Sequence, residues 1–243
     1  MVQKTIDLGY LSVPDGGGPG VVIIHDVWGL YDHFRDIANR LANEGFVALA
    51  LDLYRSMDSR PRADDPGAFM RELSDPAVLR DVQAAVDALH AHPAVAGQGV
   101  GVTGFCMGGS FALLAGALVQ RVDAVAAFYG ILSYGTGLYA SERPLDPAKK
   151  PIEPLEAARS LRCPMIAFYG SEDQFVSLED VSELERRAGS GLHGSQVHVY
   201  AGAGHAFVND TRPQAYRPEA ASDAFRHMVT FFRETLARAE PRP

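Results

Sequence analysis

Short, continuously apolar runs alternate along this chain with segments whose apolar residues recur at helical spacing. Residues 21–24 are all β-branched, and comparable runs follow at residues 46–51 and 100–103. An unbroken apolar run is typical of a strand buried on both faces, as parallel sheets require. After the first run, Phe34 and Ile37 begin a helical period. Repeated strand-then-helix units predict an α/β fold, with a mostly parallel central sheet flanked by helices on both faces.

The pattern continues along the rest of the chain, which we treat as one domain over residues 1–243. Loose alternation in residues 2–13 predicts one or two edge strands. Residues 133–158 carry prolines, glycines and charges without a clear period, which predicts a loop and a candidate cap over the site. We further expect strands at residues 124–128, 165–168 and 196–200. Helices are expected at residues 32–45, with Asp32 as N-cap, and at residues 78–89 and 107–118. A further helix should begin near residue 177, and a separate C-terminal helix should end near residue 237.

Composition narrows the class of partner. The chain has 22 basic and 30 acidic residues and a formal net charge of −8, which disfavours binding to nucleic acid or anionic lipid. No basic segment followed by a long apolar run opens the sequence, and no later stretch has the length of a membrane span. The two cysteines lie in different local contexts, so we expect no disulfide. We therefore predict a cytoplasmic protein, a monomer or small homo-oligomer, that acts on a small molecule.

A cysteine occupies the sharpest motif of the chain, between a predicted strand and a predicted helix. The five residues are Gly104-Phe105-Cys106-Met107-Gly108. They place a thiol where the G-x-S-x-G nucleophile elbow places a serine. The glycines permit a sharp turn, and the N–H groups at the helix start favour a thiolate or oxyanion. The alternative is that Cys106 is only a small buried residue beside a glycine turn.

Candidate partners follow in the order that this motif requires, nucleophile, acid and histidine. Asp173 follows the expected strand at residues 165–168, and His205 follows the one at residues 196–200. Either residue alone is weak support, because acidic residues after strands are common and a lone histidine is more often structural. Their order and matching positions predict a Cys-Asp-His triad.

The triad predicts nucleophilic catalysis through a covalent intermediate. His205 exchanges the proton of the sulfur, and Asp173 orients the imidazole and stabilises its cation. Cys106 then forms a thioester that water cleaves. The oxyanion needs two backbone donors, for which we predict the N–H groups of Met107 and of Val27 in the loop after the first buried strand.

Five stretches of the chain together resemble the dienelactone hydrolase family, the carboxymethylenebutenolidases, in order and over nearly the whole length. They are His25-Asp26-Val27-Trp28-Gly29, Asp52-Leu53-Tyr54, Gly104-Phe105-Cys106-Met107-Gly108-Gly109, Gly170-Ser171-Glu172-Asp173 and Gly204-His205-Ala206-Phe207. The resemblance implies an α/β-hydrolase fold and hydrolysis of an enol-lactone, such as 4-carboxymethylenebut-2-en-4-olide to maleylacetate. It implies neither a metal nor an organic cofactor.

Two positions depart from the pattern of that family. Members that use this substrate carry a glutamate, bonded to the resting thiol, where this chain has the shorter Asp26. Asp26 is therefore either a catalytic carboxylate or a brace of its loop. The family arginine that holds a substrate carboxylate is replaced by Asn209, and Arg212 is the nearest guanidinium. Arg212 is either a substitute clamp or a solvated surface charge.

Aromatic residues near the expected strand ends are candidates for the pocket wall. Trp28, Tyr129 and Phe207 would suit a flat, unsaturated ring, although each is equally compatible with the core.

Other chemistries lack their motifs. The sequence contains no H-E-x-x-H or C-x-x-C pattern and no P-loop or dinucleotide fingerprint, so we expect no metal and no cofactor. Two alternatives to a lactone hydrolase stay open. One is a general carboxylesterase or thioesterase with the same triad, and the other is a non-catalytic homologue that binds small molecules.

Overall fold

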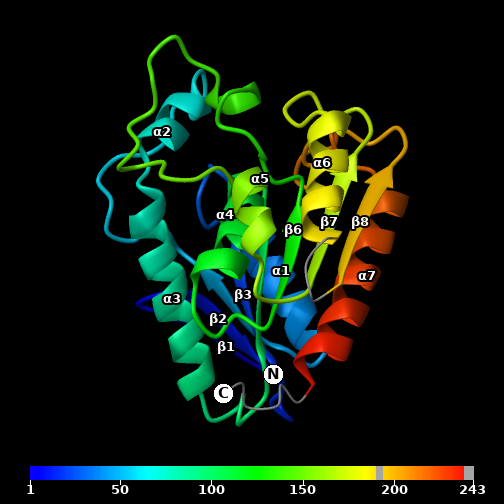
Figure 1. The fold of residues 1–243 in the computed structure, drawn as a ribbon. Helices are drawn as coiled ribbons and strands as arrows, with labels where there is room; N and C mark the ends of the chain where they lie inside the picture. The colour runs from blue at the N-terminus through cyan, green and yellow to red at the C-terminus, as the bar shows by residue number, and fades with distance from the viewer. Residues whose placement is uncertain (190–193, 238–243) are drawn as a thin grey trace.

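The computed structural model describes residues 1–189 and 194–237, and its centre is an eight-stranded sheet (Figure 1). The strands lie in the order β1-β2-β4-β3-β5-β6-β7-β8. Their bounds are β1 Val2–Ile6, β2 Gly9–Val13, β3 Gly20–Ile24, β4 Val47–Leu51, β5 Val100–Phe105, β6 Ala124–Phe128, β7 Met165–Gly170 and β8 Ser195–Tyr200.

The sheet is parallel from β4 through β8, and only β1 and β2 run antiparallel to their neighbours. Strands β3, β4 and β5 are buried along their whole length, which explains their continuous apolar sequences. Ile24 at the end of β3 pairs with Leu51 on one side and Gly104 on the other. The chain leaves β3 and β5 in opposite directions across the sheet, and such a switch point forms a crevice at the carboxyl ends of the strands.

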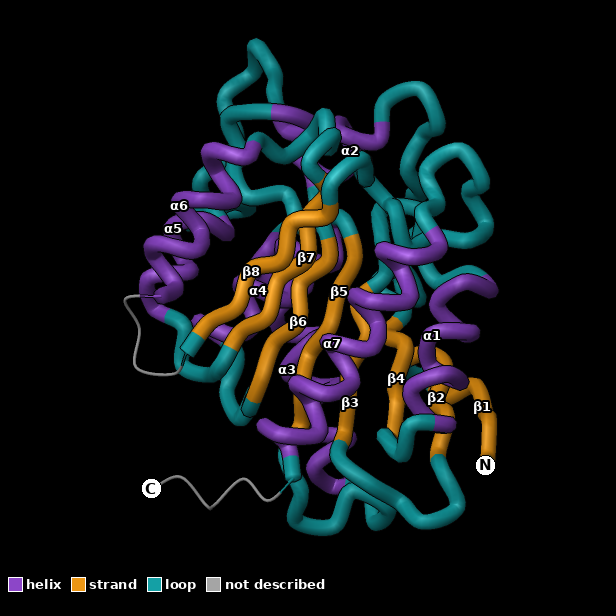
Figure 2. Tube along the Cα trace, turned by 90° about the vertical axis from the view of Figure 1, so that its right-hand side faces the viewer, coloured by secondary structure: helices purple, strands orange, loops and turns teal. Residues whose placement is uncertain are grey.

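Helices cover both faces of the sheet, as the sequence predicts (Figures 1 and 2). Helices α3, α4 and α6 lie on one face, and α1 and α7 lie on the other. Their bounds are α1 Asp32–Asn43, α2 Pro66–Glu72, α3 Asp75–Ala91, α4 Met107–Leu118, α5 Pro154–Ala157, α6 Leu178–Gly189 and α7 Pro218–Leu236, with short 3₁₀ turns η1 at Gly137–Tyr139 and η2 at Ala158–Ser160.

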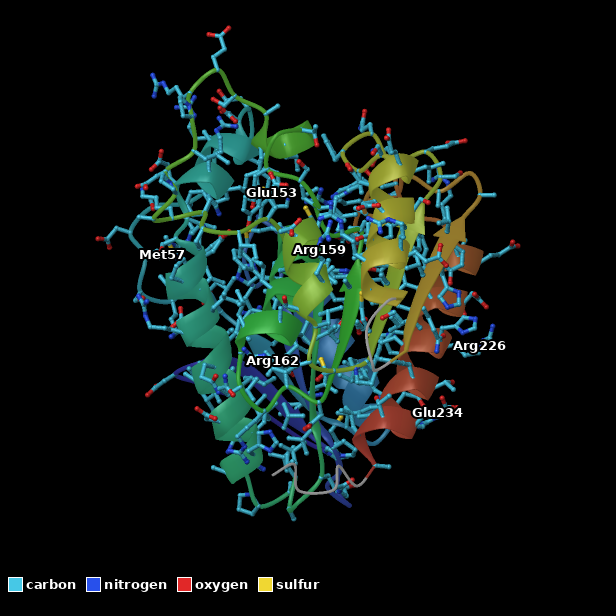
Figure 3. The ribbon with its side chains drawn as sticks, viewed as in Figure 1. Met57, Glu153, Arg159, Arg162, Arg226 and Glu234 are labelled. Atoms are coloured by element: carbon cyan, nitrogen blue, oxygen red, sulfur yellow. The ribbon has the colours of Figure 1, made fainter. Side chains whose placement is uncertain are left out.

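Helix α7 illustrates why these elements pack as they do. Arg226 and Glu234 lie on its outward side (Figure 3) and are exposed, whereas Met228 and Phe232 are fully buried against the sheet. One apolar stripe and one charged stripe make an amphipathic helix that covers a sheet face. Within the described residues, no helix combines the length and apolar character needed to cross a membrane.

Three local features differ from the sequence-based expectations. Asp32 is the first residue of α1, and Tyr31 occupies the N-cap without a side-chain hydrogen bond, so our N-cap prediction was wrong. Helix α2 was not predicted. Strands β5 and β7 run two residues further than expected, to Phe105 and Gly170.

The segment 133–158 is mostly loop, with η1, α5 and the first residue of η2 inside it, and a buried ion pair fixes it to α3. Lys150 Nζ lies 2.6 Å from Asp75 Oδ1, and the two side chains are 1% and 2% exposed. The Tyr134 hydroxyl donates to the other Asp75 oxygen at 2.5 Å. Because both charges are buried and paired, this segment is held firmly against the first turn of α3.

Candidate active site

Cys106 lies between β5 and α4 with φ 56° and ψ −117°, a backbone conformation that L-residues rarely adopt. Its N–H donates to the Phe128 carbonyl at 3.0 Å, which fixes the turn to the neighbouring strand. Strained backbone of this kind persists only where the surroundings enforce it, and it is common at functional sites. The turn holds the sulfur at the start of α4, 6% exposed, at the switch-point end of the sheet.

The flanking glycines are required by close backbone contacts. A Cβ on Gly104 would lie 1.9 Å from the Gly108 carbonyl oxygen, and one on Gly108 would lie 2.2 Å from that of Ile24. Neither contact is possible for a side chain. The glycine spacing of the motif therefore follows from packing between the elbow and β3.

The Asp173 and His205 side chains meet beside the elbow, each in the loop after its strand. Asp173 Oδ2 lies 2.8 Å from His205 Nδ1, and the Asp173 side chain is fully buried. Asp173 Oδ1 accepts from the N–H groups of Phe175 at 2.8 Å and Val176 at 3.3 Å. With its other oxygen held by the backbone, the carboxylate orients the imidazole so that Nδ1 is the protonated nitrogen.

The other imidazole nitrogen is available for chemistry. His205 Nε2 is buried and has no hydrogen-bond partner among residues 1–189 and 194–237. Burial disfavours the imidazolium, but the interactions of the ring with Cys106 and Asp173 outweigh it and raise the pKa of His205 to about 10. The rings of Tyr129 and Phe175 pack edge-on against the imidazole, with centroids 4.9 and 5.0 Å away. The Asp173 contact and these two rings fix the orientation of the imidazole.

The two expected oxyanion donors lie in the loop after β3 and at the start of α4, and one tyrosine contacts both residues. The Tyr54 hydroxyl donates to the Val27 carbonyl at 2.9 Å and lies 3.6 Å from the Met107 sulfur. Within the described chain, the N–H groups of Val27 and Met107 have no hydrogen-bond partner. Met107 N–H is one of the unpaired donors that every helix start presents.

His25 fixes the start of the loop that carries Val27. Its Nε2 accepts from the Leu53 N–H at 3.2 Å, and its Nδ1 lies 2.6 Å from the Asp26 carbonyl. These contacts require a neutral ring protonated on Nδ1. Burial lowers the pKa of His25 to about 4, so the ring is neutral at ordinary pH.

Both carboxylate oxygens of Asp26 are engaged within the loops. Oδ1 accepts from the Trp28 N–H at 2.9 Å, and Oδ2 accepts from the Tyr31 hydroxyl at 2.9 Å. Tyr31 in turn accepts from Asn209 Nδ2 at 2.9 Å. Burial raises the pKa of the Asp26 carboxyl, although these donors and Arg212 oppose the shift. Asp26 therefore connects the loop after β3 with the loop that carries the histidine.

Arg212 lies at this site rather than on a remote surface. Its guanidinium is 3.7 Å from Asp26 Oδ2 and lies over the Trp28 ring at 5.8 Å from the centroid. The side chain is 39% exposed, so part of the cation faces solvent.

The sequence profile of the Dienelactone hydrolase family matches residues 8–236 of the chain. The chain belongs to the dienelactone hydrolase family. Members of this family are hydrolases of carboxylic esters, and lactones are cyclic esters. The α/β-hydrolase fold and the enzyme class predicted from the sequence are confirmed.

Individual relatives agree with this membership. The Protein usf of Aquifex pyrophilus is 32% identical over 235 residues, which is 94% of this chain and 93% of the relative. A Bradyrhizobium protein named as a 2-oxo-3-(5-oxofuran-2-ylidene)propanoate lactonase is 32% identical over 231 residues, 93% and 88% of the two chains. A crystal structure described as a dienelactone hydrolase from Klebsiella pneumoniae superposes with a TM-score of 0.80 at 27% identity, over 96% of this chain and 98% of that one.

The aromatic residues of this chain that the sequence places in the pocket wall differ in how deeply they are buried. Tyr129 is 2% exposed, with φ 38°, and its ring packs on His205. Phe207 is fully buried between Tyr129 and Tyr200, with ring centroids 5.6 and 5.2 Å away. Phe207 is therefore a core residue, whereas Trp28 is partly exposed beside Arg212.

Two site residues, Tyr31 and Phe175, were not found from the sequence. Tyr31 contacts Asn209, which is 178 residues away, and no local pattern predicts such a contact. Phe175 was equally missed, although an aromatic two residues after the predicted triad aspartate was a usable signal. Within the described residues, no group of three or more His, Cys, Asp or Glu side chains is arranged to hold a metal ion.

Proposed function

We propose that this member of the dienelactone hydrolase family opens a lactone or cleaves an activated ester through a thioester on Cys106. The observation that carries the proposal is the strained elbow at Cys106 together with the 2.8 Å contact between Asp173 and His205. His205 Nε2 is the only ring nitrogen left for the sulfur, because Nδ1 is held by Asp173.

The first half of the reaction forms the acyl-enzyme. The thiol gives its proton to His205 Nε2, and the sulfur attacks the carbonyl carbon of the substrate. The N–H groups of Val27 and Met107 receive the oxyanion. Collapse of this intermediate breaks the C–O bond, and the proton on His205 goes to the departing oxygen, which stays tethered to the acyl group when the substrate is a lactone.

The second half restores the thiol. His205 takes a proton from water, and the hydroxide oxygen attacks the thioester carbon. The C–S bond breaks, the sulfur leaves as thiolate, and the proton on His205 returns to it. The product is a carboxylic acid, and no redox step or cofactor is required.

The surroundings of the site favour a substrate that carries a carboxylate. Arg212 presents a partly exposed guanidinium beside Trp28 and Asp26, which flank the oxyanion donor Val27 in the loop after β3. A guanidinium binds a carboxylate by two parallel hydrogen bonds. Arg212 thereby takes the role of the family arginine whose place Asn209 occupies. Trp28 adds an apolar face for an unsaturated ring.

Steady-state hydrolysis of a short p-nitrophenyl ester and of a dienelactone by wild type and Cys106→Ala tests the proposal. We expect turnover of both substrates by wild type and its loss in the variant. Circular dichroism verifies that the variant is folded. Equal rates in the two proteins would exclude Cys106 as the nucleophile. Small-molecule binding without turnover by wild type would favour a non-catalytic homologue.

A further inference from the structure

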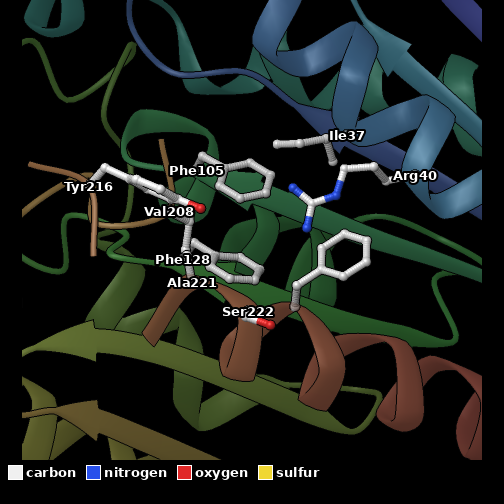
Figure 4. Close-up of a pocket in the computed structure, with 9 residues that line it drawn as sticks. Ile37, Arg40, Phe105, Phe128, Val208, Tyr216, Ala221 and Ser222 are labelled. Carbon is white, nitrogen blue, oxygen red and sulfur yellow. The ribbon is translucent and has the colours of Figure 1, made fainter. Parts of the chain in front are cut away.

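A cavity lies beneath α1 and α7, on the face of the sheet that these two helices cover (Figure 4), and neither Cys106, Asp173 nor His205 lines it. Its volume is about 260 Å³. This is slightly below the range of roughly 300–1,000 Å³ that drug-sized ligands occupy, and it suits a ligand with one ring. The lining residues come from α1, from the ends of β5 and β6, from the loop that carries His205 (the histidine loop) and from α7. Those that matter for the argument are Arg40, Phe105, Phe128, Tyr216, Ala221 and Phe225.

The walls of this cavity are largely aromatic. Phe105 and Phe128 stack at 4.6 Å with an interplanar angle of 20°, and Phe168 stacks on the other side of Phe128 at 4.5 Å, so Phe128 offers its ring edge to the cavity. Phe225 and Tyr216 add two further rings. Flat faces of this kind favour a flat ligand, because offset stacking and edge contacts both become available.

One cation enters this apolar space. The guanidinium carbon of Arg40 lies 4.1 Å from the centroid of the Phe225 ring, and the group points into the cavity in Figure 4. Within residues 1–189 and 194–237, Arg40 has no carboxylate partner at ion-pair distance. A guanidinium stacked on a ring keeps its N–H edge free for a carboxylate, which it binds in bidentate fashion.

We propose that this cavity is a binding site for a small aromatic carboxylate, separate from the catalytic site. The ring of the ligand packs on Phe105 and Phe128, and its carboxylate pairs with Arg40. The proposal does not depend on the nucleophile or on the substrate of the hydrolase.

The site is placed to influence the catalytic residues. Phe105 directly precedes Cys106 in the strained turn, so its ring and the sulfur share one rigid piece of backbone. Val208 and Tyr216 belong to the loop that carries His205. A ligand in the cavity therefore contacts the residue next to Cys106 and two residues of the loop that carries His205.

Binding of benzoate to the wild-type protein, measured by calorimetry or ligand-observed NMR, tests the proposal. We expect saturable binding of benzoate with a Kd below about 10 mM. Benzamide, which has the same shape without the charge, should bind more weakly. Arg40→Met should weaken benzoate binding about tenfold or more while changing benzamide binding less than about twofold, because the variant removes the charge-assisted bonds and keeps the apolar length.

Two controls separate this cavity from the rest of the surface. Arg35→Met, on the same helix but exposed and paired with Asp32, should leave benzoate binding unchanged. Arg212→Gln should also leave it unchanged, since Arg212 lies at the catalytic site. Ala221→Leu fills the cavity and should abolish binding of both probes. The proposal is overturned if wild type does not bind benzoate, if Arg40→Met binds it as wild type does, or if Arg212→Gln abolishes binding.

Discussion

The Tyr31 hydroxyl donates a 2.9 Å hydrogen bond to Oδ2 of Asp26, at the centre of a chain of contacts from the histidine loop to the loop after β3. The other oxygen of Asp26 accepts from the Trp28 N–H. A carboxylate held from both sides keeps its loop in place. We therefore propose that Asp26 is a brace, which was one of the two roles that the sequence left open.

Asp26→Asn keeps the size of the side chain and removes its charge. Since a brace loses only one good acceptor, we expect kcat/KM to fall about tenfold, the effect of one hydrogen bond of roughly 1.4 kcal/mol. Tyr31→Phe should lower it by a similar factor. The dependence of Cys106 alkylation by iodoacetamide on pH should be the same in both variants as in wild type. A shifted alkylation profile in Asp26→Asn alone would show that Asp26 acts on the thiol.

Arg212→Gln tests the class of substrate. If the guanidinium holds a substrate carboxylate, the variant should raise KM for a carboxylated lactone about tenfold or more, with a smaller change in kcat. A neutral p-nitrophenyl ester should be hydrolysed at nearly the wild-type rate. The measurement is a pair of saturation curves for each protein. A uniform loss on both substrates would mean that Arg212 only supports the loop through Asp26 and Trp28.

Lys150→Met leaves the buried Asp75 carboxylate without its cation. Breaking a buried pair of this kind costs about 3–5 kcal/mol, and the free energy of unfolding from urea titration measures it. The double variant Lys150→Met/Asp75→Asn should lose less, because no uncompensated charge is left. Lys149 and Glu72 form an exposed pair, 36% and 76% accessible, so Lys149→Met should cost far less stability than Lys150→Met. Equal costs for Lys149→Met and Lys150→Met would contradict this assignment.

His25 should make stability depend on pH. Its pKa in the folded protein is about 4, below the ordinary value of 6.5, so protonation favours the unfolded chain. The stabilisation is complete above pH 6.5 and is lost as pH falls from 6.5 towards 4. We expect His25 to contribute a slope of about 1.4 kcal/mol per pH unit in this window. Urea titrations at several pH values should show a shallower slope for His25→Gln, and parallel slopes would refute the role of His25.

The sheet and the elbow were predictable because their sequence signals are local. Continuous β-branched runs specify buried strands, and glycines on either side of Cys106 specify a turn that no side chain fits. The order Cys106, Asp173, His205 followed from chain topology, since each residue comes after a strand of one parallel sheet. Local signals were weaker at helix ends. Aspartate is a common N-cap residue, yet Asp32 is the first residue of α1.

The contacts that refine the site join residues far apart in sequence, and local patterns do not encode them. Asp75 and Lys150 are 75 residues apart, and neither residue stands out within its own segment. Helix α2 was missed because it is only seven residues long, although Asp65 caps it and Pro66 begins it. The role of Arg212 could not be decided from the sequence either, because its place beside Asp26 and Trp28 depends on how two loops meet.

Intact-mass analysis of the protein during turnover of an activated ester tests the thioester at Cys106 most directly. Rapid acid quenching should show a fraction of wild type heavier by the mass of the acyl group, and peptide mapping should place the addition on Cys106. The fraction of acylated protein should differ in His205→Ala, and also in wild type at a pH where deacylation is slow. Cys106→Ala should show no adduct. An unmodified Cys106 under conditions of continuing turnover, with full activity in Cys106→Ala, would contradict the cysteine mechanism.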